Sequence, residues 1–236
     1  MRPKITCHMI TSLDGRLHPS RWSDPVDGTI TGLIHRHYDT IADRFGAEGW
    51  IVGRKTMAEI AGEGAPPDLL DTPQVRPPHR ANRNGRDLAV AIDPSGRIGY
   101  AADEIEGDHA VAILSERVSD AYLAGLRETG VSYVFAGADG RELGTALKAV
   151  ADMFAVTHLL LEGGSITNGA FLAAGLIDEV STLICPAIDG LSGVPTIFEH
   201  QGPPDSRPAA GQHLCLTTCE ALDGGVVWLR HEVVHG

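Results

Sequence analysis

Residues 159–172 read Leu-Leu-Leu-Glu-Gly-Gly-Ser-Ile-Thr-Asn-Gly-Ala-Phe-Leu, and this stretch decides the fold. The three leucines at its start are a short apolar run, which is typical of a buried strand. Glu162 ends the run, and Gly163-Gly164 follows. Because glycine lacks a Cβ atom, this pair lets the backbone turn sharply or come close to a ligand. The stretch therefore predicts a strand that ends in a tight turn open to a ligand.

A helix is expected directly after this turn. Ser165, Thr167 or Asn168 can cap it, and Phe171 and Leu172 begin its apolar face. The free N–H groups of a helix start and the positive end of the helix dipole point at the same place, which favours an anion there. The alternative is that the two glycines only tighten the turn. A second helix start in the chain favours the anion site.

That second helix start is Gly53-Arg54-Lys55-Thr56, which follows the apolar run Trp50-Ile51-Val52. Two adjacent cations oppose the helix dipole at this end, so they cost helix stability unless an anion compensates. The alternative is that both are solvated side chains in a first turn. Together with the glycine pair, this segment gives the chain two helix starts suited to phosphate groups.

The turn Ser12-Leu13-Asp14-Gly15 follows a strand predicted over residues 4–10. Ligands of open α/β sheets bind beyond the carboxyl ends of the strands. Ser12 and Asp14 are therefore candidates for substrate contact, although an aspartate in a turn also commonly bonds to its own backbone. Trp22 lies between polar neighbours in the following loop. We expect it to be exposed and count it among the candidate substrate-binding residues.

Segments with strand and helix character alternate along the chain, which predicts an α/β fold with a mainly parallel sheet and helices on both faces. The last two strands should form an antiparallel hairpin. Residues 61–86, which contain Pro66-Pro67 and Pro77-Pro78, predict a surface excursion that acts as a lid or a dimer-facing loop. We expect one domain over residues 1–236. The later elements are expected as helices over 118–129 and 141–155 and strands over 131–135, 180–188, 213–222 and 226–233.

The formal net charge of −12 argues against a nucleic-acid or anionic-membrane partner, since both require a basic surface. No apolar run approaches the ~18 residues of a membrane span, and the N-terminus does not resemble a signal peptide. The four cysteines form neither a CxxC motif nor an even framework, which favours a reducing compartment and predicts a cytoplasmic protein.

No metal site is expected. His35 and His37 are two residues apart, so on a helix their side chains diverge and cannot share a metal. One of the two should lie on the surface and the other should pack inside.

Three motifs in this order carry a resemblance to a known family: Ser12-Leu13-Asp14-Gly15, Gly53-Arg54-Lys55-Thr56, and Glu162-Gly163-Gly164 with Asn168-Gly169-Ala170. The segment Ala174-Gly175-Leu176-Ile177-Asp178-Glu179 fits as well. The chain resembles the dihydrofolate-reductase-like superfamily, and most of all the reductase domain of the bifunctional riboflavin-pathway deaminase-reductase. The resemblance implies a three-layer α/β/α sandwich, NADPH as hydride donor and a homodimer. The zinc-deaminase signature of the bifunctional enzyme does not occur in the sequence.

The resemblance also implies roles for individual residues. Asp14 and Glu162 are implied on the substrate side, as groups that orient the substrate or help to protonate it, and Ser12 accompanies them. Ser115, at a predicted strand end, would border the adenosine. The residues implied near the cofactor phosphates are Gly53, Arg54, Lys55, Thr56, Gly163, Gly164 and Ser165.

One departure from the family concerns the substrate phosphate. Riboflavin-pathway reductases carry a lysine four residues before the serine of this turn, and His8 stands there in this chain. His8, if protonated, or Arg76, Arg80 and Arg83 of the proline-rich excursion could supply the missing charge. The expected activity is NADPH-dependent reduction of a ribosylaminopyrimidine phosphate. The alternatives are a reductase of a pterin or specialised metabolite, or a nucleotide-binding protein without catalytic activity.

Overall fold

The computed structural model describes residues 1–65 and 68–236, so Pro66-Pro67 lies outside the described residues. The chain forms two compact units. Unit 1 comprises Met1–Pro3 and Glu48–Leu159, and unit 2 comprises Lys4–Ala47 and Leu160–Gly236. The single domain expected over residues 1–236 stays a prediction. None of the helices in the described ranges has both the length and the apolar character that a membrane crossing needs.

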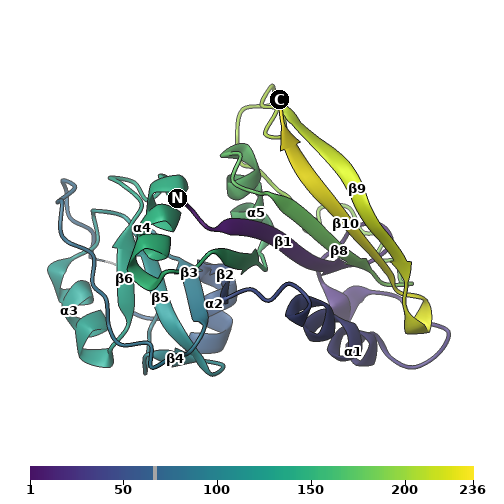
Figure 1. Cartoon of the computed structure of the whole chain (residues 1–236), viewed down its shortest axis with the longest axis horizontal. Coiled ribbons are helices and arrows are strands. Elements are labelled where there is room, and N and C mark those ends of the chain that lie inside the picture. The colour runs from purple at the N-terminus through teal and green to yellow at the C-terminus, as the bar shows by residue number, and fades with distance from the viewer. Residues whose placement is uncertain (66–67) are drawn as a thin grey trace. The chain divides into compact units, whose positions relative to one another are not determined.

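Unit 1 contains a mainly parallel sheet (Figure 1). Its strands follow the spatial order β4-β5-β3-β2, and β6 pairs with β5. The pairs of β2 with β3, β3 with β5 and β5 with β6 are parallel, whereas the short β4 is antiparallel to β5. The strands are β2 (Gly49–Gly53), β3 (Leu88–Ile92), β4 (Glu104–Ile105), β5 (Asp108–Leu114) and β6 (Ser132–Phe135). The helices are α2 (Arg54–Ala61), α3 (Asp120–Thr129) and α4 (Leu143–Phe154).

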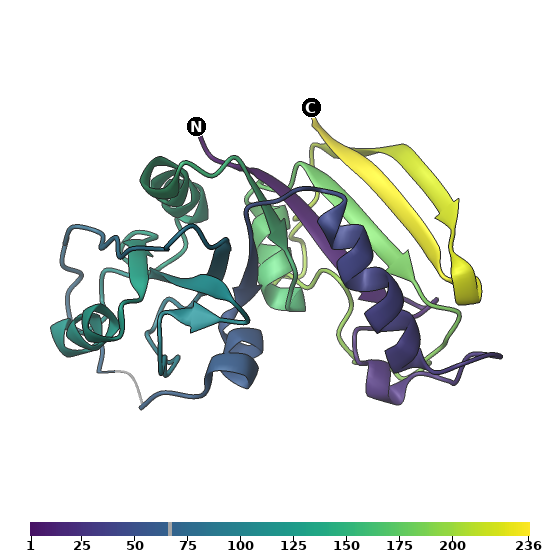
Figure 2. The ribbon, with the colours of Figure 1, turned by 60° about the horizontal axis from the view of Figure 1, so that its bottom comes forward.

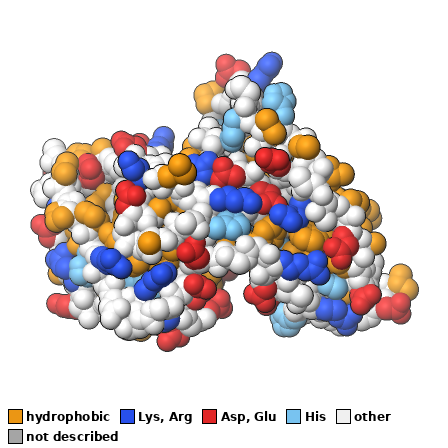
Figure 3. All heavy atoms as spheres, viewed as in Figure 1, with side chains coloured by type: hydrophobic (Ala, Val, Ile, Leu, Met, Phe, Trp, Pro, Cys, Tyr) orange, Lys and Arg blue, Asp and Glu red, His pale blue; other side chains and the backbone are white. Residues whose placement is uncertain are grey.

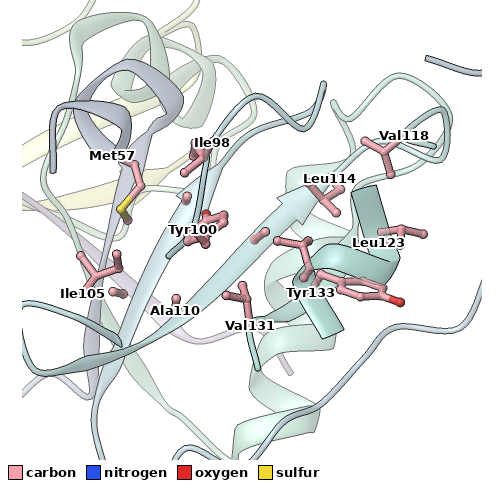
Figure 4. Close-up of a cluster of buried hydrophobic side chains, with 14 of the residues drawn as sticks. Met57, Ile98, Tyr100, Ile105, Ala110, Leu114, Val118, Leu123, Val131 and Tyr133 are labelled. Atoms are coloured by element: carbon pink, nitrogen blue, oxygen red, sulfur yellow. The ribbon is translucent and has the colours of Figure 1, made fainter. Parts of the chain in front are cut away.

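A buried apolar cluster lies on one side of these strands (Figure 4). Its members come from sheet and helices alike, because alternate residues of a strand point to one face and helical residues one turn apart share a side. Met57 of α2 and Leu114 of β5 are fully buried in it. Burying a side chain of this size contributes roughly 1.5–3 kcal/mol. Unit 1 therefore has a core of its own.

The proline-rich segment (residues 68–86) lies along the free edge of β6. His79 and Tyr133 exchange two backbone hydrogen bonds of 2.9 Å, and the Ala81 N–H donates to Ser132 Oγ at 2.9 Å. A second bridge joins Leu69 to Val118. Uncovered edge strands invite pairing with other chains, and a covering segment prevents it. The described part is bound to the sheet edge of its own unit. The role of a lid or a dimer-facing loop stays a prediction.

Unit 2 is built on a second set of strands in the order β1-β8-β10-β9. β1 and β8 are parallel, and β10 is antiparallel to both β8 and β9. The strands are β1 (Lys4–Thr11), β8 (Glu179–Ile184), β9 (Gln212–Ala221) and β10 (Val227–His235), and β7 (His158–Leu161) leads from unit 1 into this unit. The helices are α1 (Ile30–Asp43) and α5 (Ser165–Ala173), with the short 3₁₀ turns η1 (Pro19–Arg21) and η2 (Asp223–Gly225). The α/β class with antiparallel C-terminal strands is confirmed.

Helix α1 covers one face of β1 and β8 (Figure 2). Ile30, Leu33 and Ile41 of this helix enter a buried cluster with Trp228. Trp22 belongs to the same cluster and is only 7% exposed. The expectation that Trp22 is exposed is therefore wrong, because the loop after β1 turns its indole ring into the core in spite of its polar neighbours.

Unit 2 corrects one prediction from the sequence and confirms another. The strand expected over 180–188 ends at Ile184, because Pro186 has no N–H to continue the ladder. On α1, His35 is exposed and His37 is buried, as the helical spacing predicted. The ring of His37 meets the carbonyl of Asp223 at 2.9 Å.

Charged side chains of both signs are interspersed on the visible face (Figure 3). No continuous basic patch appears on that face.

Arg76 should be the main anchor of the proline-rich segment. Its guanidinium donates to the carbonyls of Glu116 and Val118 and to Asp120, all at 2.8–2.9 Å, and lies over the ring of Phe135. Arg76→Ala should lower the free energy of unfolding in urea by roughly 1.5–3 kcal/mol, the range for hydrogen bonds of a charged group.

The matched control is Arg141→Ala. The Arg141 side chain is 87% exposed and pairs with the exposed carboxylate of Asp139. Its loss should change the free energy of unfolding by less than about 0.5 kcal/mol. Equal effects of the two substitutions would contradict the anchoring role of Arg76.

Candidate functional site

The carboxyl ends of the parallel strands of unit 1 meet along one sheet edge. Gly53 is paired with Ile92, Ile92 with Ile113, and Leu114 with Phe135. The residues that follow these strands are therefore neighbours along that edge. The structure thus brings the start of α2, the turn after β3 and Ser115 to one sheet edge, and a cofactor role for these residues stays a prediction.

Helix α2 begins at Arg54, and Gly53 is its N-cap without a side chain that could cap it. The first N–H groups of a helix have no acceptor within the helix. In contrast, Thr29 caps α1 and Ser119 caps α3 through their side chains. The start of α2 thus keeps donor capacity that the starts of α1 and α3 use internally.

The two cations of this helix start differ in surroundings. Lys55 is exposed, whereas Arg54 is half-buried with a guanidinium nitrogen 3.7 Å from the carboxylate of Glu63. Arg54 also acts on Asp93, where its positive charge counters part of the rise that burial causes in the pKa of the carboxyl. Arg54 is therefore partly neutralised by the unit itself, and Lys55 presents the more open charge.

Asp93 is a polar residue of this edge whose role the sequence did not reveal. It is fully buried, and its Oδ2 accepts the N–H groups of Arg97 and Ile98 at 2.7 and 2.9 Å. Burial raises the pKa of its carboxyl. Its Oδ1 has no hydrogen-bond partner within the described ranges. Asp93 opens the turn Asp93-Pro94-Ser95-Gly96-Arg97, and an aspartate in such a turn gives no signal of burial along the sequence.

Ser115 is also largely buried. Its hydroxyl accepts the N–H of Arg117 at 3.3 Å, and its own N–H donates to the carbonyl of Pro94 at 3.0 Å. Ser115 therefore joins the turns after β3 and β5. Its predicted place beside an adenosine stays a prediction.

In unit 2, the carboxylate of Asp14, in the turn after β1, accepts several hydrogen bonds. Its Oδ1 accepts the hydroxyl of Ser12 at 2.7 Å and the N–H of Asp189 at 3.1 Å. Its Oδ2 accepts the N–H of Gly190 at 2.9 Å and lies 3.8 Å from Nε of Arg16. These hydrogen bonds, led by that of Ser12, lower the pKa of the Asp14 carboxyl to about 2. Asp14 is consequently ionised at neutral pH and acts as an acceptor.

The glycine turn of the opening stretch also lies in unit 2, beside β1. Gly163 has a φ of +107°, and a Cβ atom there would stand 3.4 Å from the Met9 side chain. The Gly163–Gly164 peptide bond is cis. Helix α5 begins at Ser165 with Gly164 as its N-cap and no side-chain cap. The expectation that Ser165, Thr167 or Asn168 caps the helix is therefore wrong.

Asn168 is instead held by a different segment. It is fully buried, and its side-chain amide donates to the carbonyl of Ile197 at 2.9 Å. At the next residue of the helix, a Cβ atom on Gly169 would lie 2.2 Å from the carbonyl oxygen of Glu199. The Asn-Gly pair thus allows the chain around residue 198 to lie directly on α5, which explains both residue types.

Glu162 is half-buried at the end of β7. Its negative charge adds to the effect of burial in raising the pKa values of Cys7 and Tyr38. Glu162 therefore lies close enough to Cys7 of β1 and Tyr38 of α1 to act on both groups.

His8 is a core residue. It is fully buried, and its ring stacks on Tyr38 of α1 with 4.5 Å between ring centroids. Its Nε2 faces the carbonyl of Tyr38 at 3.2 Å and its Nδ1 faces the hydroxyl of Ser181 at 2.9 Å. Ser181 in turn accepts the indole N–H of Trp228. A carbonyl can only accept, so this network fits the neutral imidazole with its proton on Nε2.

Burial lowers the pKa of His8 to about 4. The expectation that His8 supplies a positive charge for a substrate phosphate is therefore wrong, since α1 covers the position. Two of the loop arginines are also engaged elsewhere: Arg76 anchors its segment, and the Arg80 guanidinium lies over the Phe154 ring. Arg83 acts on Glu48 of its own unit, where it helps to lower the carboxyl pKa.

In the ranges that the structure describes, no group of three or more histidine, cysteine, aspartate or glutamate side chains is placed to hold a metal ion. The geometry of both units thus offers helix starts, hydroxyls and carboxylates as ligand groups.

Comparison with known proteins agrees with these motifs. The family model of the RibD C-terminal domain matches residues 3–228. The chain belongs to this family. A relative is the 2,5-diamino-6-ribosylamino-4(3H)-pyrimidinone 5′-phosphate reductase of Methanothermobacter thermautotrophicus, 26% identical over 205 residues and covered to 86% in both chains.

Solved structures of the RibD type share the fold. A pyrimidine reductase-like protein of Corynebacterium diphtheriae is 21% identical with a TM-score of 0.67, and the match covers 99% of this chain and 93% of that one. Acinetobacter baumannii RibD is 21% identical with a TM-score of 0.63, over 99% of this chain and 58% of that longer one. The riboflavin-pathway reductase resemblance of the sequence is thereby confirmed at the level of family and fold.

His8 should make the stability of the RibD-type fold depend on pH. Its pKa is lowered from 6.5 to about 4 in the folded protein, so the unfolded chain binds a proton that the folded protein rejects between these values. The stabilisation is complete above pH 6.5 and is lost as pH falls toward 4, by up to roughly 3 kcal/mol. Urea unfolding between pH 4 and 7 measures this slope.

His8→Phe should remove the His8 part of the slope, because it keeps an aromatic ring but cannot be protonated. His35→Phe changes an exposed histidine on the same helix-and-sheet layer and serves as the matched control. A slope that survives in His8→Phe but disappears in His35→Phe would show that the buried histidine is not responsible.

Proposed function

We propose that the chain is an NADPH-dependent pyrimidine reductase of riboflavin biosynthesis. The observation that carries the proposal is the match of the RibD C-terminal domain family over residues 3–228. The relative from Methanothermobacter thermautotrophicus is named as a reductase of a ribosylaminopyrimidinone phosphate. Two helix starts with glycine N-caps and an ionised carboxylate in a turn are the groups that such a reaction needs.

Each unit carries a helix start suited to a phosphate group of a dinucleotide. In unit 1, α2 begins without a side-chain cap and carries Arg54 and Lys55, and in unit 2, α5 begins without a side-chain cap after Gly163 and Gly164. Helix starts without a side-chain cap favour phosphate groups. When bound, NADPH supplies the hydride that is transferred to a C=N or C=O carbon.

Asp14 binds the substrate by accepting a hydrogen bond from it. An ionised carboxylate has about four acceptor positions on its two oxygens. Ser12, Asp189 and Gly190 use three of them at hydrogen-bond distance, and Arg16 stands 3.8 Å from Oδ2. The Asp14 side chain is 29% exposed, so the carboxylate can accept a further N–H or O–H donor from a polar heterocycle. A carboxyl with a pKa of about 2 carries no proton at neutral pH, so the proton that follows hydride transfer comes from water or another group.

A second candidate is a reductase of the same fold whose substrate carries no phosphate. It is favoured by the surroundings of His8, which is neutral and buried at the position where the family pattern has a lysine. The engagement of Arg76 and Arg80 within unit 1 points in the same direction. A homodimer and a cytoplasmic location remain predictions from the resemblance and the composition.

The cofactor preference follows from the charges at α2. Loss of a hydrogen bond to a charged group costs about 1.5–3 kcal/mol, or roughly 10- to 150-fold in affinity. Arg54→Ala and Lys55→Ala should therefore weaken NADPH binding by about tenfold or more and leave NADH binding nearly unchanged, as measured by titration calorimetry. The exposed Lys148 of α4 provides the control Lys148→Ala. If the variants lose equal affinity for NADPH and NADH, Arg54 and Lys55 do not bind the ribose phosphate.

The activity itself is tested by NADPH oxidation with the ribosylaminopyrimidine phosphate and with its dephosphorylated analogue. Asp14→Asn should abolish measurable turnover with the substrate while the dissociation constant of NADPH stays within about twofold, because asparagine cannot offer the same acceptor charge. Preference for the analogue would favour the second candidate. NADPH binding without turnover of either compound by the unmodified protein would refute the proposed function.

A further inference from the structure

The two loops that follow β1 and β8 form one hydrogen-bonded assembly in unit 2. The N–H of Leu13 donates to the carbonyl of Ala187 at 2.8 Å, and the N–H of Leu17 to that of Pro195 at 3.1 Å. Ser23 exchanges two further bonds with Ile188, one through its hydroxyl. We call residues 12–23 and 187–196 the paired loops. Asp14 lies within the first of them and is bonded to the second.

Asp189 contributes to the paired loops through both its backbone and its side chain. Its backbone N–H donates to Asp14 Oδ1 at 3.1 Å. Its carboxylate is fully buried and accepts two hydrogen bonds of 2.9 and 3.3 Å from the guanidinium of Arg21. The same carboxylate accepts the N–H of Leu191 at 3.0 Å. The Arg21 fork and this amide fix the backbone of the turn.

The fixed turn presents two consecutive amides to Asp14. Gly190 adopts a φ of +76°, a left-handed conformation that glycine tolerates best. With residue 190 in this conformation, the N–H groups of Asp189 and Gly190 converge on the carboxylate of Asp14. Successive amides arranged in this manner form a concavity that binds anions. Here the bound anion is a side chain of the protein.

We propose that Asp189, held by Arg21, is a positioning residue for Asp14. Asp189 does not contact the substrate: its buried carboxylate orders the two amides that hold Asp14, and Asp14 then keeps its remaining acceptor position directed to the substrate. The inference rests on the proposed function for the role of Asp14 toward substrate. The positioning of Asp14 itself rests on the contacts within the paired loops and can be tested without turnover.

The test compares Asp189→Ala, Arg21→Ala and the control Glu220→Ala in the full chain. Glu220 pairs with Arg44 at 3.4 Å, and both side chains are exposed in the same unit. The ionisation of Asp14 is followed by the ¹³Cγ chemical shift between pH 3 and 7. The charged groups that face Asp14 and its turn are Arg16, Asp189 and Arg21.

In the unmodified protein and in Glu220→Ala, Asp14 should remain ionised over this whole range. In Asp189→Ala its titration should move upward into the range, toward the ordinary value of 3.8 but below it, because the amides are no longer held together while the Ser12 hydroxyl still donates to the carboxylate. Arg21→Ala should shift the titration in the same direction. A role of Asp189 in loop stability alone would lower the melting temperature without moving the titration of Asp14.

The kinetic readout uses the pyrimidine substrate and NADPH separately. Asp189→Ala should lower kcat/KM for the substrate about tenfold, the equivalent of one charge-assisted hydrogen bond, with the dissociation constant of NADPH unchanged. An Asp14 titration that is unaltered in both loop variants overturns the proposal. If Asp189→Ala fails to fold, Arg21→Ala decides, since this side chain is 42% exposed. If the unmodified protein shows no turnover, the proposed function fails and the titration still decides the positioning.

Discussion

Parallel strands that neighbour each other end at the same edge of a sheet, and much of unit 2 follows from this constraint. Thr11 of β1 is paired with Ile184 of β8, so the two following loops enter the same small region. Their backbone N–H and carbonyl groups need partners there. Direct backbone bonds satisfy some of them, and the carboxylate of Asp14 satisfies the amides of Asp189 and Gly190. A candidate ligand group is thereby part of the structure that supports it.

Buried polar groups in this protein are satisfied in two different ways. His8 remains neutral and belongs to a chain of hydrogen bonds through Ser181 to Trp228. Glu179 keeps its charge, because Lys4 and Arg230 donate to it at 2.6 and 2.5 Å and lower its carboxyl pKa. A buried charge is tolerated only when it is paired. Both residues lie in the sheet of unit 2, yet only the paired group is expected to be charged at neutral pH.

The edge strands of the two units also differ in how they are covered. In unit 1 the proline-rich segment pairs with β6 through His79 and provides partners for its exposed backbone groups. In unit 2 the edge strand β9 carries Leu214 and Leu216, which are 61% and 55% exposed. Covering an edge by a segment of the same chain limits pairing with other chains. This gives a structural purpose to a segment whose composition suggested only an irregular loop.

The sequence by itself determined the alternation of strands and helices, the two helix starts at Gly53 and Gly164, and the turn at Asp14. These features depend on local properties: apolar periodicity, the missing Cβ of glycine, and the tendency of aspartate to accept hydrogen bonds from nearby amides. The motif order of these segments was sufficient to indicate the family. Local patterns predicted these features because the relevant interactions lie within a few residues.

Only the tertiary structure decided which polar or aromatic groups face a ligand and which face the core. Trp22 and His8 are both buried because residues distant in sequence, on α1, β8 and β10, complete their surroundings. The amides that hold Asp14 come from residues 175 and 176 positions further along the chain. Burial and the resulting pKa depend on all neighbours in space. A sequence pattern specifies only the neighbours along the chain, so it could name Asp14 but could not show what holds it.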